Sequence, residues 1–497
     1  MNNFKEINTK QEKKFLLEKI EIFNRIVKLE TEAKDDNRYI EYNYINTINE
    51  LVNLGIINSC DEINDLKKFL GNKIFENFIN MINLKLKYSI DNEYINRLYK
   101  YENRIKFPNE NKKYKLVDLF CGAGGLSLGF IQEGVEVVLA NDIEPICIET
   151  YKFNHPNIKD EKVIAGDLKE IVDNISDYID SSIDLDFLVG GPPCQGFSSA
   201  NQQRIIDDPR NELYKYFLKA VEALKPKVVV MENVKGMLRV ADQVVEDYKN
   251  INVNINGKSC NYQVGYEVIN SKWFSVAQSR ERLIYIAIRS DIKKEKNISL
   301  EKIFDELLNI RKKEYNLRDA LYGLPVLYAQ HEKNKNEVDD LKSGYKITSY
   351  NCEVNDYINL INNNKKNLYL FNHKARFLNE NNFEIYSRLN PGDDATDEKI
   401  SDIMPYAHRN HCFKDKYYKL IPDKPCRTIT AHLKMDGHSH IHPFQVRSLT
   451  PREAARIQSF PDDYFFLGSY LHTYMQIGNA VPPKMANGIA KILINKL

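Results

Sequence analysis

Cys194 is the residue of this chain best placed to do chemistry. It stands in the sequence GGPPCQG, residues 190–196, where the prolines exclude a helix because each fixes φ and lacks an N–H donor. Residues 185–189 before it are typical of a short buried strand. Open α/β sheets bind their ligands at loops that follow strand ends, so this thiol is a candidate nucleophile. The alternative is a small buried apolar residue, which a loop setting disfavours.

A carboxylate and two guanidinium groups could act beside this thiol. Glu232 follows the apolar run 228–231, and Arg280 and Arg282 stand directly before another strand-like run, 283–288. We expect these groups to gather with the cysteine at the same edge of one parallel sheet and to form a coherent site there. As an alternative, Glu232 could be the partner of a structural ion pair and the arginines part of a solvated face.

A glycine-rich turn precedes these groups in the chain. Residues 118–130 read DLFCGAGGLSLGF, a strand end that turns into a helix, although Ser127 stands where a dinucleotide-binding pattern needs its third glycine. Asp142 ends the next strand-like run, where a carboxylate suits hydrogen bonds to ribose hydroxyls, and Asp167 ends another short segment. The pattern predicts an adenosine derivative as the ligand. For each acid, the alternative is a helix N-cap or a turn residue.

Length and composition narrow the class of protein. The 497 residues suffice for two or three domains. The chain has 70 Lys+Arg and 69 Asp+Glu, so its global charge neither supports nor excludes a nucleic-acid partner. Its eight cysteines form no C-x-x-C pair, which argues against a zinc finger or a disulfide scaffold and fits a reducing cytosol. No apolar run reaches membrane-spanning length, so we expect a soluble intracellular protein without membrane contact.

The pattern along the chain changes several times. Residues 1–110 have helical periodicity and equal numbers of basic and acidic residues, which favours a packing or oligomerisation appendage over a helix-turn-helix reader of DNA. Residues 111–290 alternate between strand-like and helical runs, as in a parallel α/β sheet. Residues 290–425 are polar and irregular, and residues 447–497 are patterned again.

Six blocks, in order, resemble the DNA (cytosine-5)-methyltransferases. They are 118–130, PPCQ at 192–195, ENV at 232–234, QxRxR at 278–282, RSLTPREAARIQSFP at 447–461 and QIGNAVPP at 476–483. The resemblance implies the class I methyltransferase fold, a Rossmann-like, doubly wound, mostly parallel α/β sheet. Residues 111–290 would form the catalytic domain, 291–446 an inserted small target-recognition domain and 447–497 the C-terminal part of the catalytic domain. Residues 1–110 would be a helical N-terminal extension.

The resemblance also implies a cofactor, S-adenosyl-L-methionine, and residues that hold it. Phe120, Gly122 and Gly124 would cradle it, Asp142 would bind its ribose and Asp167 its adenine amino group. The remaining wall residues would be Pro193, Leu213, Asn479 and Ile143. Ile143 stands where relatives often have an aromatic residue, so the stack on the adenine would be weaker here or would come from another residue.

The implied reaction is methylation of C5 of a cytosine flipped out of duplex DNA. The Cys194 thiolate would add to C6, Glu232 would hydrogen-bond N3 and the amino group, and Arg282 would bind O2. Arg280 would organise the loop or bind a phosphate. Ser198 and Gln203 could fill the space that the base leaves.

Residues 291–446 would read the DNA sequence. Cations interleaved with aromatic residues in its second half suit phosphate and base contacts, although a solvated face is the alternative for any one of them. The candidates are Arg409, Lys414, Arg427, His432 and Lys434. Three alternating histidines, 438, 440 and 442, would share one face of a strand, but no cysteine pair completes a common ligand set, so no metal is expected.

The expected partners are double-stranded DNA and a cognate restriction endonuclease, with the protein monomeric on DNA and located in the cytoplasm with the nucleoid. Three alternatives remain: a tRNA cytosine-5 methyltransferase, a catalytically silent DNA-binding regulator, and a bifunctional chain with an N-terminal nuclease. The long insert favours DNA over tRNA, and the presence of Cys194, Glu232 and the glycine turn disfavours a silent regulator. Residues 1–110 contain no convincing nuclease acid cluster.

Overall fold

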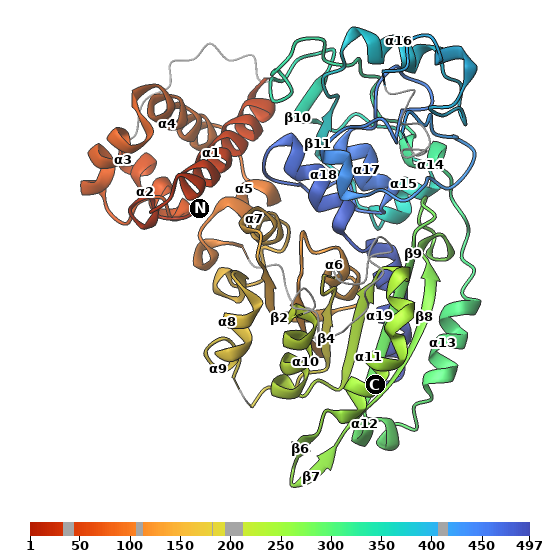
Figure 1. Ribbon diagram of the computed structural model, residues 1–497. Coiled ribbons are helices and arrows are strands. Elements are labelled where there is room, and N and C mark those ends of the chain that lie inside the picture. The colour runs from red at the N-terminus through yellow and green to blue at the C-terminus, as the bar shows by residue number, and fades with distance from the viewer. Residues whose placement is uncertain (33–43, 106–112, 181, 194–211, 406–415) are drawn as a thin grey trace.

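The computed structural model describes residues 1–32, 44–105, 113–180, 182–193, 212–405 and 416–497 (Figure 1). The predicted residues Cys194, Ser198, Gln203, Arg409 and Lys414 lie outside these ranges. Within them, no helix is both long enough and apolar enough to span a membrane.

The described residues form a seven-stranded sheet of order β3-β2-β1-β4-β5-β9-β8. The first five strands pair in parallel, and β9 runs antiparallel to both β5 and β8. Strand bounds are Tyr114–Leu119 for β1, Val135–Asp142 for β2, Val163–Ala165 for β3, Phe187–Gly190 for β4, Val228–Asn233 for β5, Tyr262–Asn270 for β8 and Glu281–Arg289 for β9. The predicted doubly wound, mostly parallel α/β sheet is confirmed.

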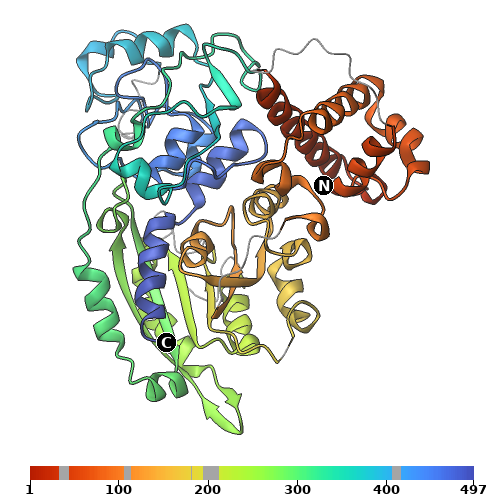
Figure 2. The ribbon, with the colours of Figure 1, turned by 180° about the vertical axis from the view of Figure 1, so that it is seen from behind.

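Helices cover both faces of this sheet, which explains why its central strands are nearly continuous apolar runs. One face packs against α8 (Leu168–Asp173), α10 (Glu212–Leu224) and α11 (Ala241–Asn250). The other packs against α6 (Gly125–Ile131), α13 (Leu300–Asn309) and α19 (Pro483–Ile494), and Figure 2 shows the last two over the sheet. The short helices α9 (Ile175–Tyr178) and α12 (Ser290–Glu295) and the hairpin β6 (Val253–Ile255) with β7 (Lys258–Cys260) complete this region.

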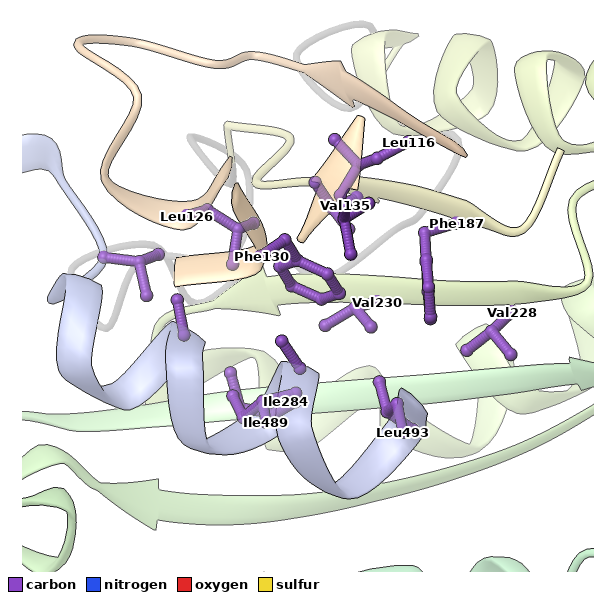
Figure 3. Packing of buried hydrophobic residues seen from close by; sticks show 14 of the residues in the cluster. Leu116, Leu126, Phe130, Val135, Phe187, Val228, Val230, Ile284, Ile489 and Leu493 are labelled. Atoms are coloured by element: carbon purple, nitrogen blue, oxygen red, sulfur yellow. The ribbon is translucent and has the colours of Figure 1, made fainter. Parts of the chain in front are cut away.

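The last helix of the chain completes the core of the sheet. Ile489 and Leu493 of α19 point toward Val230 and Ile284 on the central strands (Figure 3). A Cβ added to Gly129 of α6 would lie 2.4 Å from the backbone nitrogen of Asn487 on α19, so the two helices are in backbone contact. The two ends of the region from 114 to 497 therefore build one core.

The segment between β9 and α19 carries a smaller layer of its own. The strands β10 (Gly344–Ser349) and β11 (Tyr369–Lys374) pair antiparallel. Around them lie α14 (Leu317–Leu321), α15 (Asp356–Ile361), α16 (Glu380–Arg388), α17 (Pro451–Ile457) and α18 (Tyr470–Asn479). Buried arginines join these parts: Arg452 of α17 donates to the Phe371 carbonyl of β11 (2.8 Å), and Arg456 pairs with Asp462 (2.7 Å).

The N-terminal helices pack onto the rest of the protein. They are α1 (Lys10–Thr31), α2 (Tyr44–Leu54), α3 (Ile63–Leu70), α4 (Asn72–Lys87) and α5 (Glu93–Leu98). Thr9 and Glu12 start α1 with a capping box. Their apolar faces share one core with β10, β11, Phe465, Leu467 and α7 (Pro145–Asn154). The bundle therefore contacts both the sheet region and the smaller layer (Figure 1).

Candidate active site

The glycine turn after β1 forms the first wall of the site. Phe120, Gly122 and Gly124 all have positive φ, and a Cβ on Gly124 would lie 2.9 Å from the Tyr151 ring, so only glycine fits there. The turn is fixed to β2, because the Gly122 N–H donates to Oδ2 of Asp142 (2.8 Å). The other oxygen of Asp142 accepts from the Glu144 N–H (2.9 Å). Burial raises the pKa of Asp142, and these N–H donors oppose that shift.

Asp118, at the end of β1, is a buried carboxylate in the wall of the same site. It is 1% exposed, and neither oxygen has a hydrogen-bond partner among the described residues. Burial raises its pKa to about 7; nearby Ser127 opposes this shift and Asp142 adds to it. Asp118 thus lies in the wall of the site, where a bound ligand can supply a donor or a positive charge to its carboxylate.

These groups surround a cavity of about 480 Å³, a size typical of small-molecule sites. It lies at the carboxyl ends of β1 and β4, where the strand order of the sheet reverses. Most of the predicted residues line it: Phe120, Gly122, Asp142, Ile143, Pro193, Glu232, Arg280, Arg282 and Asn479. Ile143 is 63% exposed there.

Glu232 and Arg282 form an ion pair in this cavity, with Nε of Arg282 2.8 Å from Oε1 of Glu232. The pairing of strands brings them together: β9 is antiparallel to β5, and Glu232 is opposite Ile284, two residues beyond Arg282. Both side chains are largely buried, at 13% and 15% exposed. The other carboxylate oxygen of Glu232 lies 3.1 Å from where a Cβ on Gly191 would be, so a larger residue at 191 would crowd it.

Arg280 is fully buried and holds two distant segments at the cavity. Its guanidinium donates to the carbonyls of Ile429 (2.8 Å) and Gly478 (3.2 Å). Burial, together with the charge of Arg282, lowers the pKa of Arg280 to about 9. A Cβ on Gly478 would lie 2.2 Å from backbone atoms of residues 430 and 431. Arg280 thus joins residues 429 and 478 in the wall of the cavity.

The segment that leads to Cys194 is anchored beside Glu232. The Asn233 side chain donates to the Pro192 carbonyl (2.9 Å), and Pro192 and Pro193 line the cavity. Two other cavity-lining thiols, Cys121 and Cys147, have pKa values raised by burial, which makes them poor nucleophiles.

Three predicted cofactor residues are not in the cavity lining. Gly124 is the N-cap of α6, and Leu213 is a half-buried residue of α10 that packs against the core of the sheet. Asp167 is the N-cap of α8, and its carboxylate accepts from the Lys169 N–H (3.0 Å), which is the alternative that the sequence left open.

Among the candidate DNA-reading residues, His432 and Lys434 follow a segment that lines the cavity. Thr430 and Ala431 line it, and His432 and Lys434, in the short 3-10 helix that follows, are exposed. Arg427 lies over the ring of Tyr418, 4.9 Å from its centroid.

The prediction that the alternating histidines share one face of a strand is wrong. His438 stacks on Tyr417, and His440 and His442 lie outside any strand, on either side of Ile441, which forms isolated bridges. Ring stacking and isolated bridges, rather than regular strand pairing, hold the segment that contains these histidines. The described residues contain no group of three or more potential metal ligands.

Sequence reasoning missed several wall residues. Asp118 stands inside the glycine block, and its place as an acid at the end of a buried strand was the available signal. Thr430, Ala431 and Met475 come from segments far along the chain, which no local pattern connects to β1.

Comparisons with known proteins agree with this geometry. The chain matches the C-5 cytosine-specific DNA methylase family over residues 114–495. It is 32% identical over 401 residues to the type II methyltransferase M.DdeI of Desulfomicrobium norvegicum, covering 76% of this chain and 87% of the relative. It is 31% identical over 406 residues to the type II methyltransferase M.Sau96I of Staphylococcus aureus, covering 80% of each.

Among solved structures, one similar protein is a prophage-encoded protein of E. coli, described as a DNA modification methyltransferase. The TM-score is 0.58 at 24% identity, covering 77% of this chain and 99% of that one. This likeness supports the α/β fold alone. The N-terminal residues 1–113 lie outside the family match.

Proposed function

We propose a reaction for this chain, which belongs to the C-5 cytosine-specific DNA methylase family and is therefore a DNA cytosine methyltransferase. It transfers the methyl group of S-adenosyl-L-methionine to C5 of a flipped-out cytosine in a specific duplex sequence. The observation that carries the proposal is the Glu232–Arg282 pair, which faces the same cavity as the glycine turn and the residues leading to Cys194.

The cavity residues fit this cofactor, which would supply an electrophilic methyl group. Asp118 offers an unpaired buried carboxylate to a cationic ligand. Asp142, held by two backbone N–H donors, offers an oriented carboxylate that suits ribose hydroxyls. Phe120, Ile143 and Pro193 provide apolar wall. Asp167 would accept from the adenine amino group through Oδ2, because its capping bond from the Lys169 N–H uses Oδ1.

The protein groups would activate the base from both sides of its ring. The thiolate of Cys194 would form a bond to C6, which makes C5 electron-rich enough to accept a methyl group. Glu232 would hydrogen-bond N3 and the exocyclic amine and stabilise the charge that develops there. Arg282 orients this carboxylate through its 2.8 Å contact and would bind O2 of the base. Loss of the C5 proton and cleavage of the sulfur–C6 bond would then release the product.

The remaining proposals concern DNA and partners. The duplex would be read by the segment 291–446, through the candidates Arg409, Lys414, Arg427, His432 and Lys434. Ser198 and Gln203 would support the flipped base. A cognate restriction endonuclease is proposed because the curated relatives are named as type II methyltransferases. We propose a monomer on DNA, in the cytoplasm with the nucleoid.

Trapping with 5-fluorocytosine tests the reaction. A duplex carrying this base cannot lose the C5 substituent, so the wild-type protein with cofactor should form a covalent adduct that survives denaturation and maps to Cys194. Cys194→Ser should form no adduct yet still bind DNA. A wild-type protein that methylates DNA without a trappable adduct would refute the thiol mechanism.

A further inference from the structure

Helix α18 begins with an unusual set of contacts. Its N-cap residue, Ser469, makes no capping hydrogen bond with its side chain. Instead, the Tyr470 N–H donates to Oε1 of Glu337 (2.8 Å), and the Gly468 N–H donates to Oε1 of Glu18 (2.7 Å). One carboxylate therefore satisfies the first N–H of the helix and a second holds the residue before its N-cap, where negative charge also complements the helix dipole.

These carboxylates come from two parts of the chain outside the sheet region. Glu18 lies on α1 of the N-terminal bundle, with a side chain only 9% exposed. It also pairs with Lys346 of β10 (2.5 Å), whose Nζ donates to the Gly468 carbonyl (3.1 Å). Glu337 precedes β10 in the segment 291–446. One end of α18 is thus held jointly by the bundle and by the segment proposed to read DNA.

The other end of α18 forms part of the cavity wall. Met475, Gln476, Gly478 and Asn479 line the cavity. Gln476 connects the two ends, because its side chain donates to the Leu467 carbonyl (2.8 Å) while its Oε1 has no partner among the described residues.

A shift of α18 cannot be absorbed at the cavity end. Gly478 is in backbone contact with residues 430 and 431, and its carbonyl accepts from Arg280. A ten-residue helix moves as a rigid rod, so displacement at Tyr470 would move the wall at Asn479 and press on the segment at 430–431.

We propose that Glu18 and Glu337 are positioning residues that fix α18 and thereby set how tightly the cavity binds S-adenosyl-L-methionine. The N-terminal bundle and the recognition segment are then coupled to the cofactor site through one helix. The identity of the ligand rests on the proposed function; the coupling itself does not.

The test compares matched variants in the full-length protein without DNA. Glu18→Ala and Glu337→Ala should each weaken cofactor binding, measured by calorimetry, about three- to fivefold, and about tenfold together. Hydrogen exchange should accelerate in residues 470–479 but not in α19. Glu18→Gln and Glu337→Gln keep an oxygen acceptor and should retain most of the affinity. Melting curves show that each variant is folded.

Glu30→Ala is the control. Glu30 lies on the same helix α1 and accepts from the Tyr369 hydroxyl of β11, but it does not contact α18. It should leave both the cofactor affinity and the α18 exchange unchanged. Alanine variants of Glu18 and Glu337 that behave like the control would overturn the proposal. A protein that binds cofactor with this dependence but transfers no methyl group to DNA would instead refute the proposed function alone.

Discussion

Asp118 should make the stability of the ligand-free protein fall as the pH rises. Burial raises its pKa from the ordinary value of 3.8 to about 7, so the folded state favours the protonated form. The cost of ionising it is absent below about pH 4, grows with pH and is complete above about pH 7. A difference of about three pKa units corresponds to about 4 kcal/mol of unfolding free energy, an upper limit if the protein relaxes around the charge.

Asp118→Asn removes this cost while keeping the side-chain shape. We expect the ligand-free variant to match the wild type near pH 4 and to be about 2–4 kcal/mol more stable at pH 8, measured by urea unfolding across this range. Asp186→Asn is the matched control, because Asp186 is 5% exposed but bonded to the Lys115 N–H (2.8 Å) and to Lys227 (2.9 Å). The control should lose stability at pH 8. An Asp118→Asn protein that gains none would refute the reasoning.

The same substitution should have the opposite effect on cofactor binding. If the ionised Asp118 meets a cationic group of S-adenosyl-L-methionine, Asp118→Asn should weaken binding about tenfold or more at pH 8. Near pH 7, binding to the wild type should also release part of a proton, because the cation lowers the pKa of Asp118 again. Calorimetry in two buffers of different ionisation enthalpy measures this release. Equal heats in both buffers would place the cation elsewhere.

Three further changes test the site and the fold. Glu232→Gln should lower the single-turnover methylation rate about hundredfold and change cofactor affinity less than about twofold; a near-normal rate would count against the carboxylate. Gly478→Ala should cost about 1–3 kcal/mol in urea unfolding, because its Cβ would meet the backbone of residues 430–431; an unchanged midpoint would contradict that contact. Deleting residues 1–105 should give aggregated protein, because it uncovers the core shared with β10 and β11; a soluble, active fragment in size-exclusion chromatography would show that the bundle is dispensable.

The apolar runs in the sequence located most of the sheet. Those at 114–120, 135–140, 185–189, 228–231 and 283–288 correspond to β1, β2, β4, β5 and β9. The edge strand β8 was not predicted, because its partly exposed residues mix polar and apolar types and its pairing partner lies beyond a turn. Buried strands can be predicted from their apolar composition, whereas the formation of an edge strand depends on the strand with which it pairs.

The residues of the candidate site could be predicted where an acidic residue stands at the end of a strand-like apolar run. Glu232 and Asp142 met this condition, and both line the cavity. Asp167 also follows a strand-like run in the sequence, but its carboxylate caps helix α8 by accepting from the Lys169 N–H. The sequence pattern alone does not separate this capping role from a place in the cavity wall. The shared core of the N-terminal bundle could not be predicted, since it depends on contacts with residues more than 300 positions away. For example, Nε of Arg25 donates to the Ile347 carbonyl (3.0 Å).

The direction of β9 decides whether the arginines can reach the carboxylate. The sequence argument placed Arg280 and Arg282 before a strand of a parallel sheet, but in a parallel strand such residues would lie at the edge opposite Glu232, roughly 20 Å away. Because β9 is antiparallel to β5, its first residues lie beside the last residues of β5. The Glu232–Arg282 pair therefore depends on the turn from β8 and on the β5–β9 register. A slip of one residue would move Arg282 to the other face of the sheet and leave the carboxylate without its partner.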